Sequence, residues 1–194
     1  LPTLSRLFDE VKGFEQSPQC VRIAKKSMRR HANVSVEVAH RTRAGMRDRF
    51  DTALCVNVAI HPSKREWHQV LRSLFSILKA GGRLLLVVPS FESSTLVAEA
   101  EPDDQDDEPS SATTSRVRAR IRPGIVRFGG VPTKHFRQRE LREALVALGL
   151  KPVRFRRVEY SWASYGMSPQ RRFRGSGPWD WLAIAEKAAT TTPR

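Results

Sequence analysis

Residues 50–89 read FDTALCVNVAIHPSKREWHQVLRSLFSILKAGGRLLLVVP, and this stretch decides the fold. It contains two short apolar runs, residues 52–58 and 83–88, whose lack of polar alternation predicts strands in a sheet covered on both faces. Between them, apolar side chains at spacings of three and four predict a helix of about four turns, capped by Ser63. Gly81 and Gly82 are predicted to end this helix in the left-handed conformation. The apolar stripe consists of Trp67, Val70, Leu71, Leu74, Phe75 and Leu78.

A strand, a crossover helix and a second strand in this order form a right-handed parallel unit. Ligands of such sheets bind beyond the carboxyl ends of the strands. In this chain those ends are residues 55–62 and 89–92. The stretch therefore predicts half of an α/β nucleotide-binding fold.

The same residues resemble the class I methyltransferases that use S-adenosylmethionine. In that family the fourth strand commonly reads FDxVxxxNVLEH, and the helix after it leads into LKPGGRLLLxVP. The chain matches this pattern at Phe50-Asp51, Asn57-Val58, His61, residues 78–86 and Val88-Pro89. The resemblance implies a Rossmann-like α/β sheet that is flanked by helices, mostly parallel, and closed by an antiparallel last strand. The alternative is another Rossmann-like protein with a similar glycine turn.

Upstream, residues 11–18 and 19–28 resemble the second strand of this family and the helix that follows it. The resemblance places Glu15 and Gln16 where the cofactor binds. A carboxylate there can accept hydrogen bonds from both vicinal hydroxyls of the ribose. The alternative role for Glu15 is interaction with the dipole of the helix that begins near Ser17.

Residues 33–38 alternate as a third strand should, and the family often places an Asp shortly after it to bind the adenine amino group. Here His40 and Arg41 occupy that place; histidine can offer a ring nitrogen to adenine or stack on it. The resemblance further implies that Asn57 and Val58 lie near the methyl-donor end of the cofactor. A second departure is Ile60, which replaces a frequent acidic residue before His61.

The first strand of the family and its glycine-rich loop have no counterpart in the chain, and residues 1–8 resemble the tail of the helix that follows that loop. We therefore expect a longer natural product, and methyltransferase activity if the missing loop is supplied upstream. The missing strand normally lies between the second and the fourth, so the sheet is expected to lack its middle member. The alternative is a degenerate relative that has lost the loop.

Residues 99–115 change abruptly in composition and hold seven of the chain's 20 acidic residues. Such a run cannot bury apolar area and predicts a disordered insert. An acidic flap over the basic surface of the chain is the alternative. Arginines then recur with a period of two at Arg116, Arg118, Arg120 and Arg122. The prediction is a single domain over residues 1–194, with this insert and a flexible tail at 188–194.

Residues 137–148 predict an amphipathic helix, and His135 lies just before it, where related enzymes often line the substrate side. His135 and His61 are candidate acids or bases, because histidine titrates near neutrality. The alternative for His135 is a position of no function at the helix start. Residues 151–160 and 179–187 are expected to pair, with the latter as the last strand. Their connection carries Trp162, Tyr165, Phe173 and three arginines, which favour a lid over a small substrate, or a surface that stacks on nucleic acid.

The composition, with 40% hydrophobic residues, agrees with one globular domain. Two cysteines indicate no disulfide framework, and no spacing of metal ligands occurs. No apolar run is long enough to span a bilayer and no signal peptide is visible, so a cytoplasmic location without membrane attachment is expected. A missing N-terminus would hide such a signal.

The net charge is +14, from 34 basic and 20 acidic residues, and it would attract phosphates or acidic surfaces. The sequence as a whole predicts transfer of a methyl group from S-adenosylmethionine to a small-molecule acceptor that the residues do not identify. Two alternatives stay open: a nucleic-acid methyltransferase or basic RNA-binding protein, and a non-catalytic methyltransferase-like interaction domain. The oligomeric state is not predicted.

Overall fold

In the computed structural model the chain is described over residues 1–38, 46–100, 124–128, 130–167, 173, 175 and 177–189. It divides into two compact units, Leu1–Met46 and Arg47–Arg194. His40, Arg41, the alternating arginines, residues 101–115 of the predicted insert and residues 190–194 of the predicted tail lie outside the described residues. The single domain over residues 1–194 stays a prediction.

The first unit contains a short parallel sheet. Its elements are α1 (Pro2–Leu7), β1 (Val11–Glu15), α2 (Pro18–Ser27) and β2 (Val34–Val38). Strand β1 pairs in parallel with β2, with Val11 opposite Val34 and Glu15 opposite Val38. Asn33 ties the end of α1 to the start of β2, because its side-chain amide donates to the carbonyls of Ser5 and Phe8, each at 2.9 Å. The predicted strands and helix of this region are confirmed.

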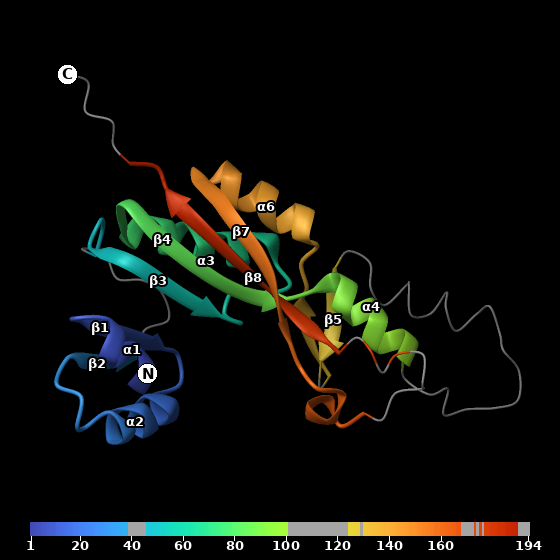
Figure 1. The fold of residues 1–194 in the computed structure, drawn as a ribbon, viewed down its shortest axis with the longest axis horizontal. Helices are drawn as coiled ribbons and strands as arrows, with labels where there is room; N and C mark the ends of the chain where they lie inside the picture. Colours follow the sequence, from blue (N-terminus) through green and yellow to red (C-terminus); the bar gives the residue numbers. More distant parts are fainter. Residues whose placement is uncertain are drawn as a thin grey trace, which may run out of the picture. The chain divides into compact units, whose positions relative to one another are not determined.

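The second unit contains a four-stranded sheet in the order β3-β4-β8-β7 (Figure 1). Strand β3 is parallel to β4, and β8 is antiparallel to both of its neighbours, which confirms the predicted antiparallel last strand. A separate pair, β5-β6, forms a short hairpin. The elements are β3 (Phe50–Val56), α3 (Lys64–Ile77), β4 (Leu78–Pro89), α4 (Phe91–Ala100), β5 (Ile125–Phe128), β6 (Val131–Lys134), α6 (Gln138–Ala147), β7 (Leu150–Glu159), η1 (Trp162–Tyr165) and β8 (Trp179–Lys187).

The two sheets are separate, as expected for a methyltransferase sheet without its middle strand. Strand β1 pairs only with β2, and β3 pairs only with β4. Within the described part of the chain, no strand pairs with the second edge of β1 or of β3. The division between the two units falls at the same place in the sequence, between β2 and β3.

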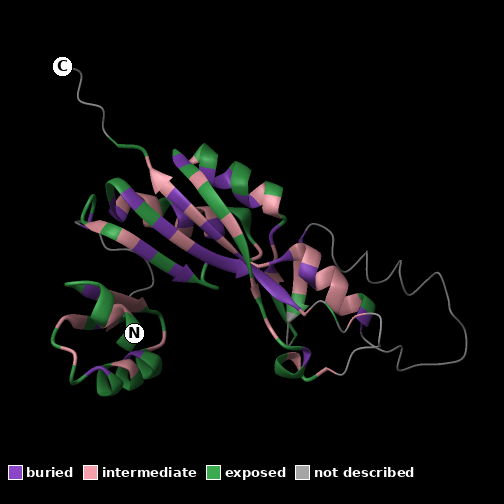
Figure 2. Cartoon of the chain, viewed as in Figure 1, coloured by how far each residue is buried: buried purple, intermediate pink, exposed green. Residues whose placement is uncertain are grey.

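Helices α3 and α6 cover one face of the four-stranded sheet (Figure 1). On this face Leu84, Leu86 and Ala183 have no exposed surface, and the guanidinium of Arg142 in α6 lies 4.7 Å from the ring centre of Phe155 in β7. The opposite face carries exposed apolar side chains; Leu54, for example, is 48% exposed. Buried, half-buried and exposed residues alternate along the strands of the sheet (Figure 2). Leu54 lies opposite Leu85 of β4. Because side chains alternate along a strand, every second residue counted from Leu54 or Leu85 also belongs to this second face.

The start of β4 differs from the prediction. Helix α3 ends at Ile77, not at the two glycines, and Leu78 pairs with Phe50 as the first residue of β4. Gly81 has the expected positive φ of 76° but lies inside the strand, next to a register shift in the pairing of β3 with β4. Leu78 is fully buried in the sheet. Its pairing with Phe50 therefore decides its conformation, although its spacing from the apolar residues of α3 would also suit a helix.

Two further differences concern the segments around the predicted insert. Helix α4 extends to Ala100, so Glu99 and Ala100 are helical and do not belong to a disordered insert. The β5-β6 hairpin, which ends at Lys134, was not predicted. Its turn contains Gly130 with a φ of 81°, a conformation that glycine adopts at little cost.

Candidate functional site

Three polar side chains converge where β3 and β7 end and β8 begins. Oδ2 of Asp180 accepts a hydrogen bond from the Tyr160 hydroxyl at 2.9 Å and from the Asn57 side-chain amide at 3.2 Å. Asn57 follows β3, Tyr160 follows β7, and Asp180 is the second residue of β8. The antiparallel direction of β8 produces this convergence, because it brings the start of that strand to the carboxyl ends of the others.

The surroundings of Asp180 hold two phenols in the protonated form. Burial, then the hydrogen bond to Asp180 and the charge of its carboxylate, raises the pKa of Tyr160 to about 12. Burial and the same carboxylate also raise the pKa of Tyr165. The centres of the two rings are 6.1 Å apart. Near neutral pH both hydroxyls therefore carry their protons, and that of Tyr160 donates to Asp180.

His135 lies close to this cluster and its tautomer follows from its partners. The Ser94 hydroxyl donates its proton to the Ser90 carbonyl at 2.9 Å, and Ser94 Oγ is also hydrogen-bonded to Nδ1 of His135. A hydroxyl has one proton, so Nδ1 must donate and Nε2 must carry the lone pair. Burial lowers the pKa of His135, against the opposing effects of the Ser90 carbonyl and the charge of Asp180. Among the described residues Nε2 has no partner, so His135 is a neutral base with an available lone pair at neutral pH.

The start of α4 connects the end of β4 to the start of β8. Ser90 caps the helix by accepting the N–H of Ser93 at 3.0 Å, and Ser93 Oγ accepts the N–H of Trp179 at 2.8 Å. The Glu92 carboxylate accepts the indole N–H of Trp181 at 3.0 Å. These bonds fix the element that carries Ser94, the partner of His135, relative to the strand that carries Asp180.

The structure places the other predicted proton acceptor, His61, on the surface. Its Nδ1 accepts the N–H of Ser63 at 3.0 Å, which stabilises the start of α3. The backbone N–H of Lys134 donates to the carbonyl of Ile60 at 2.8 Å. His61 follows Ile60 and His135 follows Lys134, so this backbone hydrogen bond joins the two segments that carry the candidate histidines. Only His135 contacts Ser94 and Ser90. Val58 is exposed near Asn57.

In the first unit, Glu15 is exposed at the carboxyl end of β1 and makes the contact foreseen as its alternative role. Its Oε1 accepts the N–H of Ser17 at 2.9 Å, and Ser17 Oγ in turn accepts the N–H of Cys20 at 3.3 Å. Among the described residues Oε2 has no partner, so the carboxylate keeps one oxygen for the hydroxyls of a ribose. Gln16 is exposed beside it. This donor and acceptor chemistry fits the predicted ribose end of S-adenosylmethionine.

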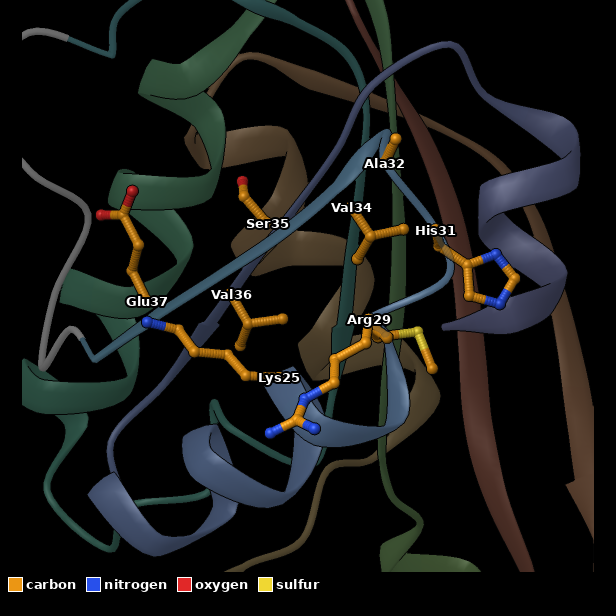
Figure 3. Close-up of a pocket in the computed structure, with 9 residues that line it drawn as sticks. Lys25, Arg29, His31, Ala32, Val34, Ser35, Val36 and Glu37 are labelled. Carbon is orange, nitrogen blue, oxygen red and sulfur yellow. The ribbon is translucent and has the colours of Figure 1, made fainter.

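A hollow of about 420 Å³ lies elsewhere in the first unit, between α2 and β2 (Figure 3). Three basic side chains, Lys25, Arg29 and His31, lie around it together with Glu37, and none of the predicted site residues lines it. The His31 ring is already hydrogen-bonded to the Ser5 hydroxyl at 2.8 Å. The remaining lining residues are Met28, Ala32, Val34, Ser35 and Val36.

The prediction from sequence missed Tyr160 and Asp180, although a signal was present. Residues 179–187 form an apolar strand, and Asp180 is an acid between two tryptophans at its start. A carboxylate in a buried strand is unusual unless something pairs with it. Asp180 is 6% exposed, and its partners come from residues 20 and 123 positions earlier in the chain.

Comparison with solved structures identifies the fold. A SAM-dependent methyltransferase of Methanosarcina mazei aligns with a TM-score of 0.66 at 17% identity, over 97% of this chain and 86% of that one. Magnesium protoporphyrin IX methyltransferase of Synechocystis, with bound SAH, aligns with a TM-score of 0.57 at 15% identity, over 96% and 68%. The 1,6-didemethyltoxoflavin-N1-methyltransferase of Burkholderia thailandensis aligns with a TM-score of 0.55 at 17% identity, over 92% and 61%. The fold is that of the class I methyltransferases.

Comparison of the sequence agrees with this result. Residues 1–82 match the family model described as Methyltransferase domain. The fold of the chain is thus the class I methyltransferase fold, and its sequence over residues 1–82 is similar to that of a methyltransferase domain, which confirms the predicted resemblance. A search of curated proteins finds no match.

In the described part of the chain no helix is both long enough and apolar enough to cross a membrane. The same residues contain no group of three or more His, Cys, Asp or Glu side chains that could hold a metal ion.

Proposed function

We propose that the protein transfers a methyl group from S-adenosylmethionine to a small-molecule acceptor. The observation that carries this proposal is the cluster of Asn57, Tyr160, Asp180 and His135 at the carboxyl ends of the strands in a methyltransferase fold. Ligands of open α/β sheets bind at this edge. Two proteins of similar fold, which act on 1,6-didemethyltoxoflavin and on magnesium protoporphyrin IX according to their names, support an acceptor of this kind.

The cofactor residues proposed for this chain are those expected from the resemblance. Glu15 and Gln16 would bind the ribose, His40 and Arg41 the adenine, and Asn57 with Val58 would lie near the methyl-donor end. Oε2 of Glu15 has no partner among the described residues, which supports the first assignment, since a carboxylate oxygen is a strong acceptor for a hydroxyl. When bound, the cofactor supplies a methyl group on a positively charged sulfur.

The residues of the chain would act mainly by positioning. Holding an acceptor atom in line with the methyl group supplies most of the acceleration in such a displacement. An acceptor that must lose a proton needs a base, and the lone pair on Nε2 makes His135 the better placed of the two histidines. His61 remains a second candidate, but its Nδ1 accepts the Ser63 N–H, so the neutral ring carries its proton on Nε2 and would act there as an acid.

Calorimetric titration with S-adenosylhomocysteine tests this proposal. We expect the chain to bind this product, and Glu15→Gln to weaken binding about tenfold, because one charge-assisted bond to the ribose is lost. Asp9→Asn, the same chemical change at a nearby acid, is the control and should leave the affinity unaltered. Failure of the folded chain to bind S-adenosylhomocysteine would favour a non-catalytic interaction domain.

A second candidate is a nucleic-acid methyltransferase or a basic RNA-binding protein, favoured by the charge of strand β7. This strand carries the exposed side chains of Lys151, Arg154, Arg156 and Arg157. Basic side chains in a row can follow a phosphate backbone, but binding of that kind alone falls steeply with salt. We prefer the small-molecule acceptor because the polar cluster is compact and partly buried. A cytoplasmic location remains a prediction from the sequence.

A further inference from the structure

Asp180 is a buried acid whose hydrogen bonds with the described residues all end on one of its two carboxylate oxygens. It is 6% exposed, and both of its hydrogen bonds, from Tyr160 and Asn57, end on Oδ2. Among the described residues Oδ1 has no partner, and no Lys, Arg or His forms an ion pair with Asp180. Buried carboxylates are normally paired, and each remaining acceptor site normally receives a donor.

The position of Asp180 in the sheet places Oδ1 at the proposed acceptor site. Asp180 pairs with Pro89, the last residue of β4, and shares its face of the sheet with Leu182 and Ile184. That is the face without α3 and α6, at the edge where ligands of such sheets bind. The phenols of Tyr160 and Tyr165 lie beside it and present aromatic surface.

We propose that the methyl acceptor is a nitrogen compound whose N–H donates to Oδ1 of Asp180, so that the methyl group is transferred to that nitrogen. The inference rests on the proposed function and names its substrate class. A nitrogen nucleophile becomes more positive as it attacks a sulfonium methyl, and a nearby carboxylate stabilises that charge.

An oxygen acceptor fits this carboxylate poorly. Alcohols and phenols react best as oxyanions, which a neighbouring carboxylate repels. The protein contains an internal example, because burial first, and then the hydrogen bond to Asp180 and its charge, raise the pKa of the Tyr160 phenol to about 12 and so oppose formation of its oxyanion. A phenolic substrate placed at the same carboxylate would experience the same opposition.

The transfer balances with the residues present and the proposed methyl donor. The lone pair of the acceptor nitrogen forms the new N–C bond while the S–C bond breaks, and the electron pair of that bond stays on sulfur. The products are the N-methylated acceptor and S-adenosylhomocysteine. The proton of the N–H passes to Oδ1 of Asp180 and from there to water.

Matched pairs of small heterocycles test the inference on the full chain. Indole and benzimidazole have an N–H, while benzofuran and benzoxazole have the same ring frame with an oxygen atom in place of that donor. Ligand-observed NMR would measure the affinity of each, with and without S-adenosylhomocysteine. At least one N–H compound is expected to bind about tenfold or more tightly than its oxygen-containing partner, the effect of one charge-assisted hydrogen bond.

Two variants then assign the preference to Asp180. Asp180→Asn should abolish the difference between paired compounds, whereas Asp51→Asn, at an exposed acid that pairs with Lys79, should retain it. Equal affinities within every pair, no binding of either member, or a preference that survives in Asp180→Asn would overturn the inference. The affinities of the paired compounds are compared on the unaltered protein. This comparison therefore still tests the inference if Asp180→Asn fails to fold. Loss of S-adenosylhomocysteine binding would instead count against the proposed function, and the N–H preference would still report on Asp180.

Discussion

Tyr160 and Asp180 form a hydrogen-bonded pair that lasts only while the phenol keeps its proton. The ordinary pKa of tyrosine, 10.0, is raised to about 12 here, chiefly by burial and then by the carboxylate. The folded state thus holds this proton more tightly than the unfolded state does. By linkage, the stabilisation is complete below about pH 10 and is lost as the pH rises toward 12.

A spectroscopic titration checks this at the level of single side chains. The protein has only two tyrosines, so the ultraviolet absorbance of phenolate should rise in steps that can be assigned by substitution. We expect Tyr160→Phe to remove the step near pH 12, and Tyr165→Phe to retain it. Asp180→Asn should shift that step toward lower pH, because the negative charge is removed. Ionisation of both phenols at the ordinary pKa of 10.0 would contradict the geometry of the pair.

At the scale of elements, the start of β4 requires glycine at two positions, Gly81 and Gly82, for different physical reasons. Gly81 has a φ of 76° and nothing within 4 Å of the place where a Cβ would stand. Gly82 has no positive φ, but a Cβ there would lie 2.8 Å from the Lys79 carbonyl oxygen and 3.2 Å from that of Phe50. The first position restricts backbone conformation, and the second restricts space.

Alanine substitutions should separate these two effects. Gly81→Ala is expected to lower the free energy of unfolding by about 1–2 kcal/mol, the cost of a left-handed conformation for a residue with a Cβ. Gly82→Ala should cost more, because its clash is with backbone carbonyls of β3 and β4 that cannot rotate away. Urea denaturation measures both values. A smaller loss at Gly82 than at Gly81 would show that β4 begins differently from the structure described here.

Elements with strong local patterns were predictable and those decided by pairing were not. The parallel pair β3-β4, the antiparallel β8 and helix α6 follow from apolar periodicity and from the resemblance, and all are confirmed. The predicted end of α3 was wrong because Leu78 fits the apolar stripe of the helix equally well. Only its pairing with Phe50 decides its conformation. The Asp180 cluster depends on contacts between distant residues, which periodicity along the chain does not contain.

For the whole molecule, charge is the property that distinguishes a small-molecule enzyme from a nucleic-acid-binding protein. The net charge is +14, and residues 101–115 contain six acidic residues and no basic ones. Replacing those six with Asn and Gln keeps the length of the chain and raises the formal net charge to +20. Exposed charges in salt at about 0.15 M interact over only about 8 Å.

Binding of a single-stranded uridine oligonucleotide to both forms of the protein tests the alternatives. We expect the neutralised form to bind more tightly at low salt and both forms to bind weakly at about 0.15 M salt, since non-specific phosphate contacts are salt-labile. Fluorescence anisotropy at several salt concentrations gives the slope. Affinity of the unaltered chain that persists at physiological salt would support the nucleic-acid alternative instead. A large gain for the neutralised form at that salt would support an acidic flap over the basic surface.

The place of β8 in the sheet also has a consequence for synthesis of the protein. This strand lies between β4 and β7, although it is translated after every other helix and strand described here. Until it leaves the ribosome, β7 has no partner in the sheet, and the carboxylate of Asp180 is absent. Contacts between such distant residues form slowly and expose unpaired edges meanwhile. A stop codon or frameshift shortly before residue 179 would therefore remove β8, which lies inside the sheet, and leave β7 without a partner strand.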